Sequence, residues 1–170
     1  VPLGQMVALD RWAIERTRAL QEEVLAAYRS YQFHLIYQKL HNFCVVDLGG
    51  FYLDVIKDRL YTTPAASPAR RSAQTAMHWI AEAMTRWLAP ILPFTAEEIW
   101  RYLPGERAES VFLETWTRFP AGPLDDSGID WPRVLEARSA VLRELEKLRV
   151  AGAIGAPLDA IPALRRSMET

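Results

Sequence analysis

Residues 89–100 read Ala89-Pro90-Ile91-Leu92-Pro93-Phe94-Thr95-Ala96-Glu97-Glu98-Ile99-Trp100, and this run determines how the flanking helices are joined. Its two prolines predict that one helix ends here, because proline lacks an amide hydrogen and restricts the residue before it. Thr95 and Glu98 have the spacing of a capping box, and Phe94 and Ile99 that of a hydrophobic staple. We therefore expect a sharp corner and then a short helix over residues 96–103.

Apolar residues recur at intervals of three and four before this corner, which is the pattern of amphipathic helices. The pattern predicts long helices over residues 9–30, 33–59 and 67–89. Ser67 as the N-cap and Pro68 at the first helical position mark the start of the third. Gly49 and Gly50 lie inside the second, where each costs about 1 kcal/mol relative to alanine. We expect one continuous helix there, bent or closely crossed at the glycines.

The chain after the short helix is irregular until a last helical pattern. Residues 107–119 lack a helical period and are expected to lie extended across the other helices. Asp130 is placed to cap the last helix, and Gly152 is placed to end it.

These patterns predict an all-α protein. Short connections between long amphipathic helices favour antiparallel neighbours. We expect an antiparallel helical bundle over residues 1–119 and a Pro- and Gly-containing linker over residues 120–129. Residues 130–170 then hold a further long helix and the start of a junction segment.

Composition limits the possible classes of protein. The chain has 170 residues, half of them hydrophobic, and its formal net charge of -1 gives no overall support for nucleic-acid binding. No apolar run approaches the roughly 20 residues that span a bilayer, so we expect no membrane partner. The single cysteine excludes an internal disulfide and fits a reducing, cytoplasmic compartment. Because the chain opens on Val1, we expect a piece of a longer protein.

The sequence offers little support for catalysis. It has no Gly-rich phosphate loop and no paired cysteines with zinc-site spacing. His41 and Cys44 lie one helical turn apart, but a zinc site needs further ligands. Glu97 and Glu98 are explained by the preference for negative charge in the first turn of a helix. We therefore predict no catalytic residue, no metal ligand and no cofactor in this chain.

A cluster of basic residues is the remaining candidate. Lys57, Arg59 and Tyr61 end the second predicted helix, and Arg70 and Arg71 stand in the first turn of the third, where the helix dipole disfavours cations. Cations beside an aromatic ring suit a single-stranded nucleic-acid loop. The alternative is a solvated surface with pairs to neighbouring aspartates, and residue types alone favour that alternative.

Four ordered motifs then identify a resemblance. The chain closely resembles the anticodon-binding region of bacterial isoleucyl-tRNA synthetase, a class I enzyme, over about residues 8–158. The motifs are Leu9-Asp10-Arg11-Trp12, Phe51-Tyr52-Leu53-Asp54-Val55-Ile56-Lys57-Asp58-Arg59-Leu60-Tyr61, Ala69-Arg70-Arg71-Ser72-Ala73-Gln74-Thr75 and the run from Ala89 to Trp100. Any one would be weak, but their common order is specific.

The resemblance implies a helical bundle of the class I anticodon-binding type that grips the anticodon stem-loop of tRNA(Ile). Lys57, Arg59 and Tyr61 would contact the loop, and Arg70 and Arg71 the backbone phosphates. Phosphate contacts would position the RNA, while base contacts would specify it. The full enzyme would charge tRNA(Ile) with isoleucine, using ATP with magnesium.

The departures from the family are equally informative. The His-Ile-Gly-His and Lys-Met-Ser-Lys-Ser signatures of the catalytic domain are absent, and so are the editing domain, the cysteines of the C-terminal zinc module and the bundle's first helix. We expect this chain to bind without catalysing, alongside the remaining domains of the synthetase. An apolar face left by the missing helix predicts a possible dimer. The alternative function is a helical protein-interaction or scaffold module that shares only the fold.

Overall fold

The computed structural model describes residues 1–122, 124, 125 and 127–155. In that part of the chain all regular structure is helical, which confirms the predicted all-α class. The elements are η1 (Leu3–Gln5), α1 (Ala8–Arg29), α2 (Phe33–Asn42), η2 (Phe43–Tyr52), α3 (Leu53–Thr62), α4 (Pro68–Leu88), α5 (Pro93–Tyr102), η3 (Val111–Leu113) and α6 (Trp131–Val150). They divide into two compact units, Val1–Ser127 and a second that begins at Gly128.

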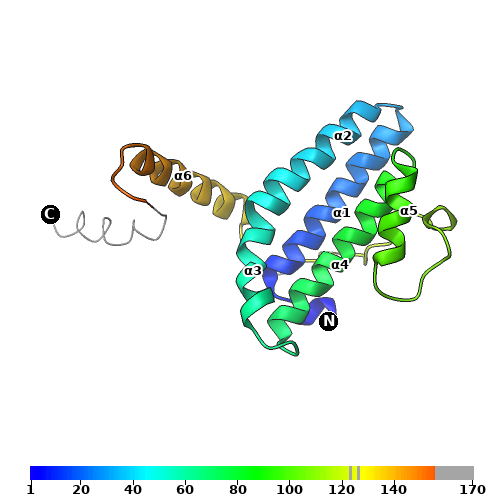
Figure 1. The fold of residues 1–170 in the computed structure, drawn as a ribbon, viewed down its shortest axis with the longest axis horizontal. Helices are drawn as coiled ribbons and strands as arrows, with labels where there is room; N and C mark the ends of the chain where they lie inside the picture. The colour runs from blue at the N-terminus through cyan, green and yellow to red at the C-terminus, as the bar shows by residue number, and fades with distance from the viewer. Residues whose placement is uncertain (123, 126, 156–170) are drawn as a thin grey trace. The chain divides into compact units, whose positions relative to one another are not determined.

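The first unit is an antiparallel arrangement of helices. α1 and α4 run in one direction, while α5 and the continuous column formed by α2, η2 and α3 run in the other (Figure 1). α1 packs on both α2 and α4, α3 packs on α4, and α5 packs on α4. The turn between α3 and α4 therefore lies at one end of the unit, together with the N-terminal residues (Figure 1). The corner between α4 and α5 lies at the other end.

The predicted second helix is continuous but changes its geometry at its centre. Residues 43–52 form a π-helix, whose hydrogen bonds span five residues instead of four. The two glycines explain why this is possible. A Cβ added at Gly49 would lie 3.1 Å from the carbonyl oxygen of Cys44, and one added at Gly50 would lie 3.0 Å from that of Val45. Each glycine thus faces a carbonyl five residues earlier, closer than side chains normally come.

Gly50→Ala is therefore expected to lower the thermal stability of the chain. At an ordinary helix position this substitution would stabilise by about 1 kcal/mol, but here the new methyl group would press on a backbone carbonyl. Gly4→Ala is the matched control, since a Cβ there would meet nothing within 4 Å. Thermal unfolding of both variants checks the prediction. A rise in Tm for Gly50→Ala would show that η2 can relax to an α-helix without loss.

The corner after α4 is confirmed, but the expected cap is wrong. α5 begins at Pro93 with Leu92 as its N-cap, so Thr95 lies inside the first turn. Proline fixes a helical φ and needs no amide partner, which makes it a ready first residue. The amide of Leu92 donates to the carbonyl of Leu88 at 2.7 Å and turns the chain. The side chain of Phe94 is 90% exposed, so no hydrophobic staple forms.

The segment after α5 is held against the helices. Val111 is buried in η3, and the amide side chain of Gln21 on α1 donates to the carbonyl of Thr117 at 2.8 Å. Further on, the guanidinium of Arg18 donates to the carbonyls of Pro120 and Gly122 at 3.2 and 2.6 Å. Residues 116–122 therefore contact α1 and α4, whereas η3 packs on α5.

The second unit contains α6. The carboxylate of Asp130 accepts the amide hydrogen of Arg133 at 3.1 Å, which confirms the predicted cap. Gly152, with φ of +70°, follows the end of the helix in a left-handed conformation that favours glycine. The predicted junction segment lies outside the described residues from residue 156 onward.

Candidate nucleic-acid interface

The five predicted RNA-contacting residues lie at the end of the unit formed by the turn between α3 and α4. Lys57, Arg59 and Tyr61 belong to the last turns of α3, and Arg70 and Arg71 to the first turn of α4. Threonine hydroxyls close α3, donating at 2.6 Å to backbone carbonyls four residues earlier. A short turn therefore joins the C-terminal end of α3 to the N-terminal end of α4.

Three of the five side chains are open to solvent: Lys57, Tyr61 and Arg71. Tyr61 is 85% exposed. The ammonium group of Lys57 donates to the Asp54 carboxylate at 2.7 Å, and this hydrogen bond raises the pKa of the Lys57 side chain, which is therefore charged at neutral pH. These exposed groups are available to a partner.

The other two side chains are bonded within the protein. The guanidinium of Arg70 donates to the carbonyl of Thr63 at 2.9 Å and so ties α4 to the turn. That of Arg59 forms two hydrogen bonds with the carboxylate of Asp10, at 2.8 and 3.1 Å, and its side chain is 20% exposed. Arg59 and Arg70 thus shape this end of the unit from within.

Asp10 is the centre of a buried polar cluster that sequence reasoning did not identify. Its carboxylate is fully buried and accepts hydrogen bonds from Arg59, from the hydroxyl of Tyr52 at 2.9 Å, and from the hydroxyl of Ser72. Burial and the charge of Asp10 raise the pKa of the Tyr52 hydroxyl, which stays protonated as a donor. A sequence signal existed, because Asp10 falls on the same helix face as the buried residues Ala13, Ile14 and Thr17.

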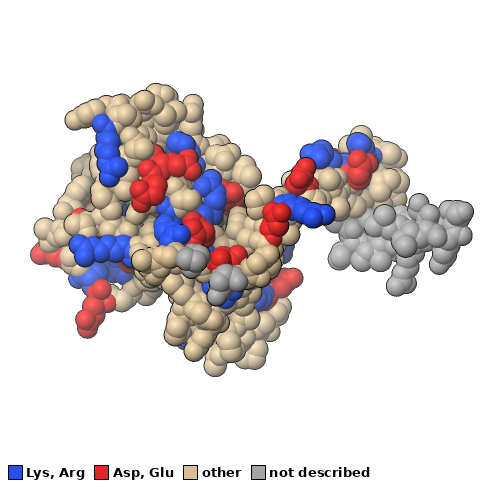
Figure 2. Space-filling model, turned by 180° about the vertical axis from the view of Figure 1, so that it is seen from behind, with Lys and Arg blue, Asp and Glu red and all other residues tan. Residues whose placement is uncertain are grey.

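Charge on the surface is mixed. On the face shown in Figure 2, basic and acidic side chains are interspersed. The same holds on α3, where Asp54 and Asp58 flank Lys57. Any anionic partner would therefore be recognised by a few placed side chains, because the chain carries a net charge of only -1.

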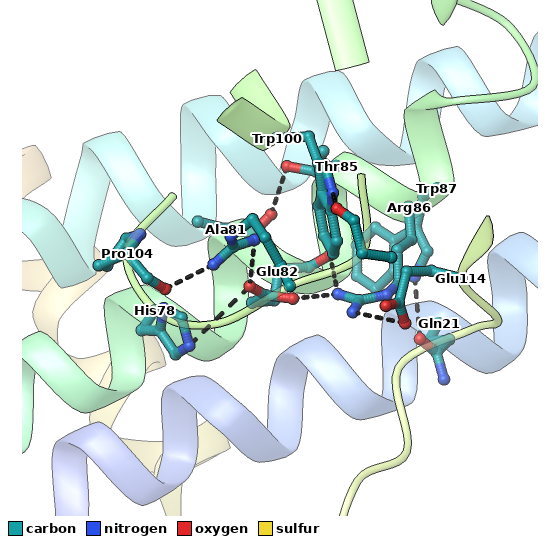
Figure 3. A network of polar contacts seen from close by, with 12 residues as sticks. Gln21, His78, Ala81, Glu82, Thr85, Arg86, Trp87, Trp100, Pro104 and Glu114 are labelled. Carbon is teal, nitrogen blue, oxygen red and sulfur yellow. Dashed lines mark hydrogen bonds and ion pairs between the residues drawn. The ribbon is translucent and has the colours of Figure 1, made fainter. Parts of the chain in front are cut away.

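A second polar cluster joins α4, α5 and the segment after α5 (Figure 3). The carboxylate of Glu82 is paired with Arg86 and, at 3.0 Å, with Arg107. Both guanidinium groups lie over the ring of Trp100, 4.7 and 4.5 Å from its centroid. The cluster borders a hollow of about 620 Å³. Because Arg86 and Arg107 are both paired with Glu82, we interpret the cluster as a structural clamp on α5.

The clamp should make the stability of the fold depend on pH. Burial opposes ionisation of Glu82, but hydrogen bonds and charge from Arg86 and Arg107 lower its pKa below the ordinary 4.5. The ionised pair therefore stabilises the fold above that value, and this stabilisation is lost as pH falls through the lowered pKa. We expect Glu82→Gln to unfold at a lower temperature than the wild type at pH 7. The difference in Tm between the two proteins should narrow below about pH 4.5. If thermal unfolding showed the same difference in Tm down to pH 3, the stabilising role of the ionised Glu82 carboxylate would be contradicted.

The other residues considered in the sequence are Glu97, His41 and Cys44. Glu97 accepts hydrogen bonds from the hydroxyl of Ser110 and, at 3.0 Å, from the amide of Val111, so it anchors η3. His41 and Cys44 are both exposed. Within the described residues, no group of three or more His, Cys, Asp or Glu side chains could hold a metal ion. Nor does any helix in the described part of the chain combine the length and apolar character needed to cross a membrane.

Comparison with known proteins gives a consistent result. A family model described as the anticodon-binding domain of tRNA ligase matches residues 10–163. The isoleucine–tRNA ligase of Halorhodospira halophila is 64% identical over 159 residues, covering 92% of this chain. Those of Nitrosococcus oceani and Methylococcus capsulatus are 58% and 60% identical over 94% and 91% of the chain. The chain spans 17% of the length of each of these relatives.

Proposed function

Because this chain belongs to the family of anticodon-binding domains of tRNA ligases, we propose that it binds the anticodon stem-loop of tRNA(Ile) within an isoleucine–tRNA ligase. The relatives support the choice of amino acid, since the three compared are isoleucine–tRNA ligases with identities of 58–64%. The chain contributes binding and orientation of the tRNA, and the rest of the enzyme contributes the chemistry.

One structural observation carries the proposal. Lys57 and Tyr61, which is 85% exposed, lie four residues apart, so they share one face of α3 at the end of the unit. An ammonium group can pair with a phosphate, and an exposed ring can stack on an unpaired base. Arg71 is exposed at the start of α4 and would contact a backbone phosphate. Arg59 and Arg70 support it through their bonds within the protein.

The full enzyme is proposed on the basis of its relatives. It would activate isoleucine with ATP and magnesium in a separate domain, hold zinc in a C-terminal module and work in the cytoplasm. The possible dimer is also a proposal. The exposed apolar residues of α2, η2 and α3 include Tyr37, Val46 and Leu53. Sedimentation of the chain as a monomer at the concentrations used for binding would exclude a dimer there.

The test is binding of the 170-residue chain to tRNA(Ile) and to an unrelated tRNA at two salt concentrations. We expect tighter binding of tRNA(Ile) that weakens as salt rises, because contacts to phosphates release counterions. Equal binding of both tRNAs would contradict recognition by this chain. Binding of neither RNA, together with salt-insensitive association with proteins, would support the alternative of a helical protein-interaction module.

A further inference from the structure

The buried carboxylate of Asp10 is the starting point. It is 0% exposed, so neither RNA nor water can reach it. Burying a charge is costly unless hydrogen bonds and an opposite charge compensate. Asp10 has both: a bidentate pair with Arg59 and two hydroxyl donors, Tyr52 and Ser72.

These partners come from separate parts of the chain. Tyr52 is the last residue of η2, Arg59 lies on α3, and Ser72 lies on α4. The hydroxyl of Ser72 also accepts the amide hydrogen of Val7, the N-cap of α1, at 2.9 Å. One carboxylate therefore ties together α1, the column of η2 and α3, and α4, next to the turn that carries the proposed RNA surface.

The pair between Asp10 and Arg59 also fixes the rotation of α3. Each helix residue advances about 100° around the axis, so Arg59 points roughly 160° away from both Lys57 and Tyr61. Exposure agrees, because the side chain of Arg59 is 20% exposed and that of Lys57 is 57% exposed. Holding Arg59 inward keeps Lys57 and Tyr61 turned toward solvent.

We propose that Asp10 is a positioning residue for RNA binding, which orients Lys57 and Tyr61 through Arg59 without contacting the RNA. The inference rests on the proposed function, because it assigns a role in the same site. It also separates the residues near the end of α3 into two kinds. Lys57 and Tyr61 touch the partner, whereas Arg59 transmits the position set by Asp10.

The experiment compares Asp10→Asn with a matched variant elsewhere in the core. Asp10→Asn removes the negative charge that faces Arg59. It also replaces one accepting oxygen with an amide N–H group, which cannot accept from the donors that surround this position. Gln21→Ala is the control, because Gln21 is 5% exposed on the same helix and bonds to Trp87 at 3.0 Å and to Thr117 at 2.8 Å. Binding of tRNA(Ile) is measured at a temperature where both variants are folded. We expect the Kd to rise about tenfold for Asp10→Asn, as for residues coupled in one network, and less than twofold for Gln21→Ala.

A second, milder variant keeps the proposal testable if Asp10→Asn does not fold. Tyr52→Phe removes one donor to Asp10 and leaves the pair with Arg59 in place, so we expect a smaller rise in Kd. Hydrogen exchange of the backbone amides of residues 57–62, measured without RNA, gives a second readout. We expect faster exchange there in Asp10→Asn and Tyr52→Phe than in Gln21→Ala.

The outcomes separate the two proposals. Unchanged exchange and unchanged Kd in the Asp10 and Tyr52 variants would overturn the positioning role, and equal losses in Gln21→Ala would reduce it to general stability. If the wild type binds no tRNA, the proposed function fails. Faster exchange confined to residues 57–62 would then still support the role of Asp10 in orienting α3.

Discussion

The double variant Lys57→Ala/Tyr61→Ala is expected to bind tRNA(Ile) at least about tenfold more weakly than the wild type. Loss of one base stacked on an aromatic ring accounts for roughly 5- to 150-fold. Loss of one phosphate contact should also reduce the slope of log K against log salt by about one. Titrations at several salt concentrations measure both quantities. A weaker affinity with an unchanged slope would assign the loss to Tyr61 and remove Lys57 from the phosphate contacts.

The chain offers a matched control for this variant. Lys147 on α6 donates to Glu144 three residues earlier at 2.8 Å, as Lys57 does to Asp54. Tyr102 on α5 is 83% exposed, close to the value for Tyr61. Lys147→Ala/Tyr102→Ala should therefore leave the Kd within twofold of the wild type. An equal loss in the control would place the RNA elsewhere on the chain. In the full enzyme, we expect Lys57→Ala/Tyr61→Ala to weaken tRNA charging and spare isoleucine activation.

Trp100→Ala should produce the largest change in stability. The side chain of Trp100 is 1% exposed, its indole nitrogen donates to the carbonyl of Ala108 at 2.9 Å, and the guanidinium groups of Arg86 and Arg107 lie over its ring. Removing a buried tryptophan leaves a cavity and typically costs about 3–5 kcal/mol. Urea unfolding measures this as a lower midpoint with a similar slope.

Phe94→Ala on the same helix is the control for the tryptophan variant. Because Phe94 is 90% exposed, removing its ring should change the free energy of unfolding by less than about 0.5 kcal/mol. A loss of several kcal/mol would show that the hydrophobic staple expected from the sequence forms in solution. Similar stability of Trp100→Ala and the wild type would contradict the clamp on α5.

Local patterns predicted the helices well. The expected helix over residues 9–30 is α1 (Ala8–Arg29), and the one that starts at Ser67 and Pro68 is α4 (Pro68–Leu88). The cap at Asp130 is also confirmed. These features depend on residues within one or two turns of each other, so periodicity and capping rules are sufficient to find them.

Local rules failed where two of them competed. Thr95 has the spacing of a cap, but Pro93 already satisfies the start of α5 two residues earlier. Gly49 and Gly50 were expected to mark a bend or a close crossing within one continuous helix, and the helix is continuous there with the backbone of a π-helix. In both cases the residues marked the right place, but local rules did not give the geometry found there.

In the candidate site, too, some features follow from nearby residues and others depend on tertiary contacts. The basic and aromatic residues at the end of α3 and the start of α4 were visible in the sequence, and helix directions place them at one end of the unit. The inward turn of Arg59 was not, because it depends on Asp10, 49 residues away. Tyr52 and Ser72 meet the same carboxylate from 42 and 62 residues away. Charge and helix position follow from nearby residues, whereas the pairing of a buried charge requires helices that meet only in the folded chain.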